Sequence, residues 1–445
     1  MLNKKTLLIV SLSFVLTGCT SVTGLFTSSE EEETIQGKRI SVLELQKSLK
    51  AETPLEEGQV LDLPDKWNNL AWPQAGGYPN HTMHNLSLGE DLKRIWSTKI
   101  GRGSSDDLPL TAQPVAAAGK VFTLDSRARL SAFDATTGKK VWDKKLSNKD
   151  EDDPVITGGV SFAHKRLYVT NGYDEVMSIE PEDGEIIWRK HLSAPSRAAP
   201  TAINGRVFVS TVDSKLTAFS AKDGSNLWAY SGIEESAGLL ATASPAANND
   251  IVIPAFSSGE VTALRVENGA IAWSDNLAKI RKIGGGKESL ADIAAMPLVD
   301  RGIVIAISFS GKLVAIDERT GNRIWQRNIS GIQTPWIAGT NLFVLTSDNQ
   351  VIAINMVNGS IYWIKELAKF ENEKKKSKPL HWHGPLMASD RLLLAGSDGK
   401  IIEMDPNTGD ITKTTKTKKT IRISPIIAQK TLYILAEDGT LVAYQ

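Results

Sequence analysis

The chain has 445 residues, and its 51 basic and 51 acidic side chains give a formal net charge of zero. This balance argues against a nucleic-acid binder, whose affinity depends on an excess of positive charge. Cys19 is the only cysteine, which excludes an internal disulfide, a cysteine-based metal cage and a cysteine nucleophile within a folded core.

The N-terminal residues have the pattern of a targeting signal. Lys4 and Lys5 precede an apolar stretch at residues 6–16, which is too short to be a resident membrane helix. Residues 16–19, Leu-Thr-Gly-Cys, resemble the bacterial lipobox, in which the cysteine is lipidated and becomes the first mature residue. We therefore predict a lipoprotein signal peptide at residues 1–18 and an acyl (palmitate-type) anchor on Cys19. Thr20 in place of Asp indicates the outer membrane under the sorting rule of well-studied Gram-negative bacteria.

Two segments separate this signal from the rest of the chain. Residues 19–39 are small, polar and acidic, with the run Glu30 to Glu33, and we expect a lipidated flexible tether there. Residues 40–92 form an N-terminal extension whose packing the sequence leaves open, because Pro and Gly break any period between residues 70 and 85.

From residue 93 onward the chain repeats. The segment at 130–142, LSAFDATTGKKVW, recurs at 176–188, 216–228, 261–273, 313–325 and 351–363. A seventh copy at 401–413 has Lys413 in place of Trp, and Glu403 in place of the small residue in the middle of the strand. Glycines in the predicted turns are 38 to 52 residues apart, which is typical of a repeat array. A second β-rich run precedes each copy, and in seven of eight cases a proline stands at a fixed distance before it.

Each repeat predicts four short antiparallel strands, which we call A, B, C and D. Strands A, B and C occur eight times, but C–D turns occur only seven times. Trp96 lies 46 residues before Trp142, so residues 93–100 are predicted to supply the missing strand D of the last blade. The sequence therefore predicts an all-β fold: an eight-bladed β-propeller of four-stranded antiparallel blades at 93–445, closed by an N-terminal strand. We expect the periodic tryptophans to seal one blade against the next; an aromatic binding belt is the alternative.

Candidate chemistry is sparse. The repeats resemble those of pyrroloquinoline quinone dehydrogenases, but that family's site uses two adjacent cysteines, a calcium ion and a catalytic Asp, and no cysteine pair exists here. His381 with His383, and His81 with His84, form two pairs, whereas a zinc or copper site needs three or four ligands in one place. We predict no catalytic residues, no cofactor and no metal.

Long connections between strand D of one blade and strand A of the next should all emerge on one face. The connections at 231–244 and 276–296 enter adjacent blades and carry apolar residues that we place outside the strand register. We predict a protein-binding rim there, with its contacts made by Leu239, Leu240, Leu290, Asp292 and Ile293.

A lipobox, an acidic tether, no catalytic apparatus and an eight-bladed ring of these repeats together resemble the BamB family. Its members are lipoprotein scaffold subunits of the outer-membrane β-barrel assembly machinery. The stretch at 72–77, Trp-Pro-Gln-Ala-Gly-Gly, and the long N-terminal region resemble its α-proteobacterial branch. The resemblance implies a non-enzymatic scaffold that binds the POTRA domains of the barrel-forming subunit and supports outer-membrane protein assembly and insertion. It implies nascent outer-membrane proteins as a further partner and a lipid-anchored position on the periplasmic face of the outer membrane.

In that family a Leu-x-Leu-Arg segment before one strand-A proline and an Asp-x-Asp segment before the next contact the partner. Alignment on Pro245 and Pro297 matches only Leu239 and Asp292 to this pattern. Two other classes of function stay open. A quinoprotein-like dehydrogenase would hold a bound cofactor, and a cell-wall-binding propeller would use the central mouth of the ring.

Overall fold

The computed structural model describes residues 49–147, 155–233, 243–278 and 293–445. They belong to the larger of the two units into which the chain divides; residues 1–48 form the other and lie outside the described part, together with 148–154, 234–242 and 279–292. Strands are the regular structure of the described residues, and no helix that could cross a membrane occurs among them.

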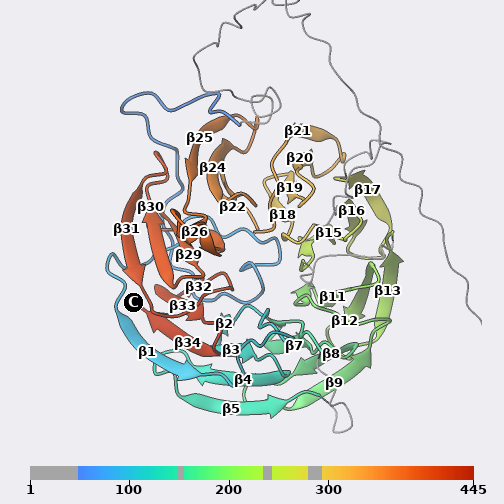
Figure 1. The fold of residues 1–445 in the computed structure, drawn as a ribbon. Coiled ribbons are helices and arrows are strands. Elements are labelled where there is room, and N and C mark those ends of the chain that lie inside the picture. The colour runs from blue at the N-terminus through green and yellow to red at the C-terminus, as the bar shows by residue number, and fades with distance from the viewer. Residues whose placement is uncertain (1–48, 148–154, 234–242, 279–292) are drawn as a thin grey trace, which may run out of the picture. The chain divides into compact units, whose positions relative to one another are not determined.

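The described strands form eight four-stranded antiparallel sheets arranged around a ring, which confirms the predicted eight-bladed propeller (Figure 1). Blades 1 to 4 each run from an inner strand A to an outer strand D in chain order. Their strands are β2 (Val115–Ala117), β3 (Lys120–Leu124), β4 (Arg129–Asp134) and β5 (Lys140–Lys145); β6 (Val160–Ala163), β7 (Arg166–Thr170), β8 (Glu175–Ile179) and β9 (Ile186–His191); β10 (Thr201–Ile203), β11 (Arg206–Thr211), β12 (Lys215–Ser220) and β13 (Asn226–Ser231); β14 (Ala246–Ala247), β15 (Ile251–Ile253), β16 (Glu260–Arg265) and β17 (Ile271–Asn276).

Blades 5 to 7 follow the same order, and a two-stranded hairpin stands between blades 6 and 7. Blade 8 takes its strand D from the N-terminal side of the ring. The strands are β18 (Leu298–Asp300), β19 (Ile303–Ile307), β20 (Leu313–Asp317) and β21 (Arg323–Arg327); β22 (Trp336–Ala338), β23 (Asn341–Leu345), β24 (Gln350–Asn355) and β25 (Ile361–Glu366); the hairpin β26 (Phe370–Asn372) and β27 (Ser377–Pro379); β28 (Trp382–Ala388), β29 (Arg391–Gly396), β30 (Lys400–Met404) and β31 (Ile411–Lys416); and β32 (Ile426–Ala428), β33 (Thr431–Leu435), β34 (Thr440–Tyr444) and β1 (Arg94–Lys99).

The ring closes by pairing β1 with β34. These antiparallel strands align from Arg94 opposite Tyr444 to Lys99 opposite Thr440. The backbone amide of Gln445 also donates to the carbonyl of Lys93 at 2.9 Å. Residues 93–100 therefore complete the last blade as predicted, and β34 has no unpaired outer edge.

Tryptophans of the D strands join neighbouring blades in a regular way. Trp188 on β9 pairs with Ser178 on β8, while its Nε1 donates to the carbonyl of Ala221 in the next blade at 3.2 Å. Its indole packs against the turn glycine Gly224, where an added Cβ would lie 2.8 Å from the ring. Among the described residues this arrangement occurs at seven seams, formed by Trp96, Trp142, Trp188, Trp228, Trp273, Trp325 and Trp363. We call these the tryptophan seams; they confirm the predicted sealing role.

Candidate functional site

The two faces of the propeller carry different connections. Because the strands of a blade are antiparallel, the B–C turns lie on the same face as the D–A connections, and the A–B and C–D turns lie on the other. We call these the D–A face and the turn face. The predicted partner residues Leu239, Leu240, Leu290 and Asp292 lie outside the described residues, so their role stays a prediction.

The sequence placed Ile293 outside the packing of the blades, but the structure buries it there. Its side chain is only 3% exposed and packs in a cluster built from blades 4 and 5, together with Ala243 and Leu277. The expectation was wrong because the end of a D–A connection must pass over the core between two blades to reach strand A, and an isoleucine there fills that core. Ile233, in contrast, is 57% exposed on the neighbouring connection.

Residues 69–88, which we call the strap, cross the inside of the ring and hydrogen bond to the innermost part of every blade. In most blades the bonded residue lies two positions after the strand-A proline or its equivalent, at the middle of the short A strand. The pairs, in strap order, are Asn69 with Ile427, Trp72 with Ala116, Pro73 with Phe162, Gln74 with Ala202, Pro79 with Ala247, Asn80 with Val299, His84 with Trp336 and Leu86 with Met387.

The strap provides hydrogen-bond partners for backbone groups at the inner edges of the blades. A strand at a sheet edge leaves backbone donors and acceptors unpaired, and burying them without partners is costly. The amide of Phe162 donates to the carbonyl of Pro73 at 2.6 Å, and Trp72 and Ala116 exchange two backbone bonds of 2.7 and 3.0 Å. Trp72 and Leu86 are at most 1% exposed and belong to the largest core cluster. The sequence left open how the N-terminal extension packs. From residue 69 onward, the extension is part of the core.

Residues before the strap lie against the turn face. The amide of Leu61 donates to Asn407 Oδ1, in the C–D turn of blade 7, at 2.8 Å. Asn341 Nδ2, at the A–B turn of blade 6, donates to the carbonyl of Asp62 at 2.7 Å. This part of the turn face is therefore covered by residues 61 and 62 of the chain's own N-terminal extension.

The two histidine pairs do not form a metal-binding group in the described part of the chain. Nδ1 of His81 lies 2.7 Å from the carbonyl of Pro297, and burial lowers the pKa of this ring to about 4, so it is neutral and donates to that oxygen. His84 lies 3.7 Å from Asp300, and burial lowers its pKa as well. Burial also lowers the pKa of His383 to about 4. No group of three His, Cys, Asp or Glu side chains in the described part of the chain is arranged to hold a metal ion.

A cavity of about 850 Å³ lies on the ring axis at the D–A face. All eight D–A connections contribute to its wall, and the strap residues Trp72, Ala75, Gly76 and His81 contribute as well. No described lining residue belongs to an A–B or a C–D turn. Ala243, Ser244, Ala294 and Met296 in the wall adjoin the two connections of the predicted partner rim.

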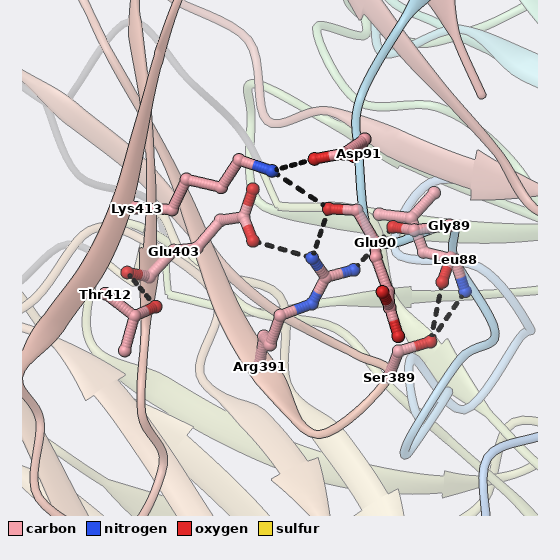
Figure 2. A network of polar contacts seen from close by, with 9 residues as sticks. All are labelled: Leu88, Gly89, Glu90, Asp91, Ser389, Arg391, Glu403, Thr412 and Lys413. Atoms are coloured by element: carbon pink, nitrogen blue, oxygen red, sulfur yellow. Dashed lines mark hydrogen bonds and ion pairs between the residues drawn. The ribbon is translucent and has the colours of Figure 1, made fainter.

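The seam between blades 7 and 8 is polar (Figure 2). Lys413 on β31 stands where the other blades have Trp, and it pairs with Glu403 on β30, where they have a small residue. The Lys413 ammonium donates to Asp91 at 2.6 Å, and the Arg391 guanidinium donates to Glu403 at 2.6 Å and to the Gly89 carbonyl at 2.7 Å. We call this the polar seam; the sequence flagged Lys413 and Glu403 as exceptions but did not identify their partners.

Comparisons with known proteins agree with this architecture. The family model described as outer membrane protein assembly factor BamB matches residues 89–165, 126–365 and 366–445. Outer membrane protein assembly factor BamB of Yersinia pestis is 25% identical over 250 residues, which are 55% of this chain and 60% of that protein. The Shewanella oneidensis protein of the same name is 26% identical over 245 residues, 54% of this chain and 59% of that protein. The matches thus span about 60% of the length of these relatives.

Solved structures show the same fold. The crystal structure of BamB from Moraxella catarrhalis superposes with a TM-score of 0.66 at 19% identity, covering 80% of this chain and all of that one. Quinohemoprotein alcohol dehydrogenase from Comamonas testosteroni also gives 0.66, at 12% identity, over 84% of this chain and 80% of the enzyme. At such identities the likeness concerns the propeller fold and does not choose between a scaffold and an enzyme.

Proposed function

Because the chain belongs to the family of the outer membrane protein assembly factor BamB, we propose that it is a non-catalytic scaffold for outer-membrane protein assembly and insertion. The observation that carries this proposal is the family match over residues 89–445, which includes every blade. We place the protein on the periplasmic face of the outer membrane, held by a lipid on Cys19. Nascent outer-membrane proteins are a further partner under this proposal.

The partner surface is the D–A face, and the partner is the POTRA region of the barrel-forming subunit. Two observations support this choice of face. The chain's own residues 61 and 62 occupy part of the turn face through bonds to Asn407 and Asn341. The described strands that flank the two predicted rim connections, β13 with β14 and β17 with β18, meet these connections at the D–A face, and Ile233 at the start of one connection is exposed. Ile293 then acts by anchoring its connection to the core rather than by touching the partner.

A quinone-dependent enzyme is the alternative that the structural neighbours raise. The adjacent cysteine pair of that enzyme family has no counterpart, since Cys19 is the only cysteine and lies far from the propeller repeats in sequence. An absorbance spectrum of the purified protein tests this alternative directly: a bound quinone would be visible, and its presence would overturn the scaffold proposal.

The partner surface is tested by binding to the isolated POTRA domains of the same organism. Truncating or reversing a central interface anchor costs about 2 kcal/mol or more when it is a hot spot. We expect Leu239→Asp and Asp292→Arg each to weaken binding at least about tenfold with an unchanged circular-dichroism melt. Lys139→Glu, in a C–D turn on the turn face, is the matched control and should bind like wild type. Wild-type binding by both rim variants together with a defect in the control would overturn the assignment.

The anchor is tested by Cys19→Ser. Two or more acyl chains hold a protein stably at a membrane, at about 0.8 kcal/mol per buried CH₂ group. We expect the variant to remain as a soluble or uncleaved precursor, measured by fractionation of the cell envelope. A processed variant that still fractionates with the outer membrane would show that Cys19 is not the anchor.

A further inference from the structure

The axial cavity is lined by D–A connections, B–C turns and strap residues. Its wall comes from D–A connections and B–C turns, so it opens on the D–A face. The strap crosses the ring and bonds to every blade, and its residues Trp72 and His81 line the cavity from the side of the turn face. We call this cavity the cup; its volume is in the range of small-molecule sites.

The cup exists because the connections around it carry small residues. Gly158, Gly159, Ala198 and Ala199 form its wall between blades 1 and 3. An added Cβ at Gly159 would lie 2.6 Å from the Cβ of Ala199, so the two segments are already as close as their backbones permit. Phe309, Ile332, Leu386 and Met296 give the rest of the wall a mainly apolar character.

Among the described side chains that line the cup, the guanidinium of Arg197 has no acidic partner. Arg422 lies 2.9 Å from Glu437, so these two side chains neutralise each other. Arg197 is half-buried in the wall and makes no hydrogen bond or ion pair within the described ranges. The buried rings of His81 and His383 are neutral at pH 7, and Nε2 of His383 is shielded from solvent with no hydrogen-bond partner in the described structure.

We propose that the cup is a binding site for a small organic anion with an apolar body, an alkyl or aryl carboxylate or sulfonate. The apolar wall would take the body and Arg197 the anionic head. A half-buried guanidinium attracts a carboxylate more strongly than an exposed one, because water screens it less. This site goes beyond the scaffold role, since a scaffold needs no ligand on the ring axis, and it is independent of which partner occupies the rim.

The test uses the complete chain carrying Cys19→Ser, so that no lipid competes for the probe. The probe is 1-anilinonaphthalene-8-sulfonate, an aromatic anion, followed by energy transfer from tryptophan and by calorimetry. We expect saturable binding near one probe per chain. Arg197→Gln should weaken it at least about fivefold, and Ala294→Trp, which fills the cup from its wall, should abolish it. Arg127→Gln is the matched control, because Arg127 is exposed on a B–C turn and does not line the cup.

Competition experiments distinguish the contribution of the anionic head to binding from that of the apolar body. Dodecanoate should displace the probe, and dodecanol, which has the same chain without the charge, should do so at least about fivefold less well. The proposal is overturned if no saturable binding occurs, if Arg197→Gln and Arg127→Gln behave alike, or if dodecanol competes as well as dodecanoate. None of these outcomes would contradict the scaffold role, because POTRA binding is measured separately and without the probe.

Discussion

The tryptophan seams and the polar seam join blades of the same shape by opposite means. At a tryptophan seam the indole ring packs on the turn glycine of the next blade, and its N–H donates to a carbonyl three residues before that glycine. Blade 8 has no C–D turn, because its strand C is β34 and its strand D is β1. A tryptophan at position 413 would therefore find no glycine turn to pack against.

Residues 89–91, which lead into β1, contact the polar seam instead. They present the carbonyls of Gly89 and Glu90 and the carboxylate of Asp91, all acceptors, and blade 7 supplies the donors Arg391 and Lys413. The apolar seal thus depends on a C–D turn in the neighbouring blade. Where that turn is missing, Lys413 stands in place of the tryptophan and Glu403 in place of the small residue, and each has its own polar partner: Asp91 for Lys413 and Arg391 for Glu403.

The largest effect is expected at a tryptophan seam. Trp188→Ala removes a ring that is 8% exposed and leaves a cavity between blades 2 and 3. Deletions of a buried tryptophan typically cost about 3–5 kcal/mol of unfolding free energy. Urea denaturation followed by circular dichroism measures this loss. Ile187→Ala on the same strand, at a residue 39% exposed, is the control and should cost less than about 1 kcal/mol. Equal losses in the two variants would mean that the rings do not hold the blades together.

The next effect concerns the polar seam. Glu403 is 1% exposed, and Arg391→Met leaves its carboxylate buried without its ion-pair partner, which typically costs about 3 kcal/mol or more. Adding Glu403→Leu removes the stranded charge, so we expect the double variant to be more stable than Arg391→Met alone. The same urea denaturation assay compares the two variants. A double variant less stable than Arg391→Met would show that the buried Glu403 carboxylate does not need Arg391 as its ion-pair partner.

The blades could be predicted from the sequence because their register is local. A turn glycine, a tryptophan four residues later and a proline before strand A recur in most units, and each of these residues packs within its own blade or against the next one. The strap could not be predicted, because residues 69–88 have no period of their own. Their partners, from Ala116 to Ile427, are spread over the whole ring.

The candidate site was predicted only in outline for a similar reason. The sequence located the long connections, but it did not show that Ile293 fills the core between two blades or that Arg197 lines an axial cup. Exceptions to the repeat, such as Glu403, marked the unusual seam. Its acceptors at 89–91 precede the repeats, and no side-chain period connects them to blade 7.

A smaller effect isolates the turn within a tryptophan seam. Gly224 and Gly205 have nearly the same φ, +70° and +72°, but an added Cβ meets the ring of Trp188 at Gly224, whereas it meets no atom within 4 Å at Gly205. Overpacking typically costs about 1–3 kcal/mol beyond the strain of the left-handed backbone. We therefore expect Gly224→Ala to destabilise the protein more than Gly205→Ala, as measured by their melting temperatures. Equal shifts would mean that the ring moves aside without cost.

The smallest effect is expected from Lys413→Ala, which removes the exposed part of the polar seam while leaving Arg391 and Glu403 in place. Hydrogen bonding to Lys413 lowers the pKa of Asp91, so the pair contributes stability above the usual carboxyl range and loses it as pH falls and Asp91 takes up a proton. Exposed pairs of this kind contribute little and are screened by salt, so we expect the melting temperature to fall by no more than about 2 °C at pH 7 and low salt. In about 0.5 M NaCl, or at a pH where Asp91 is protonated, the variant and the wild type should melt together. A loss as large as that of Arg391→Met, persisting in salt, would show that Lys413 replaces tryptophan in holding the blades and that the two kinds of seam are energetically equivalent.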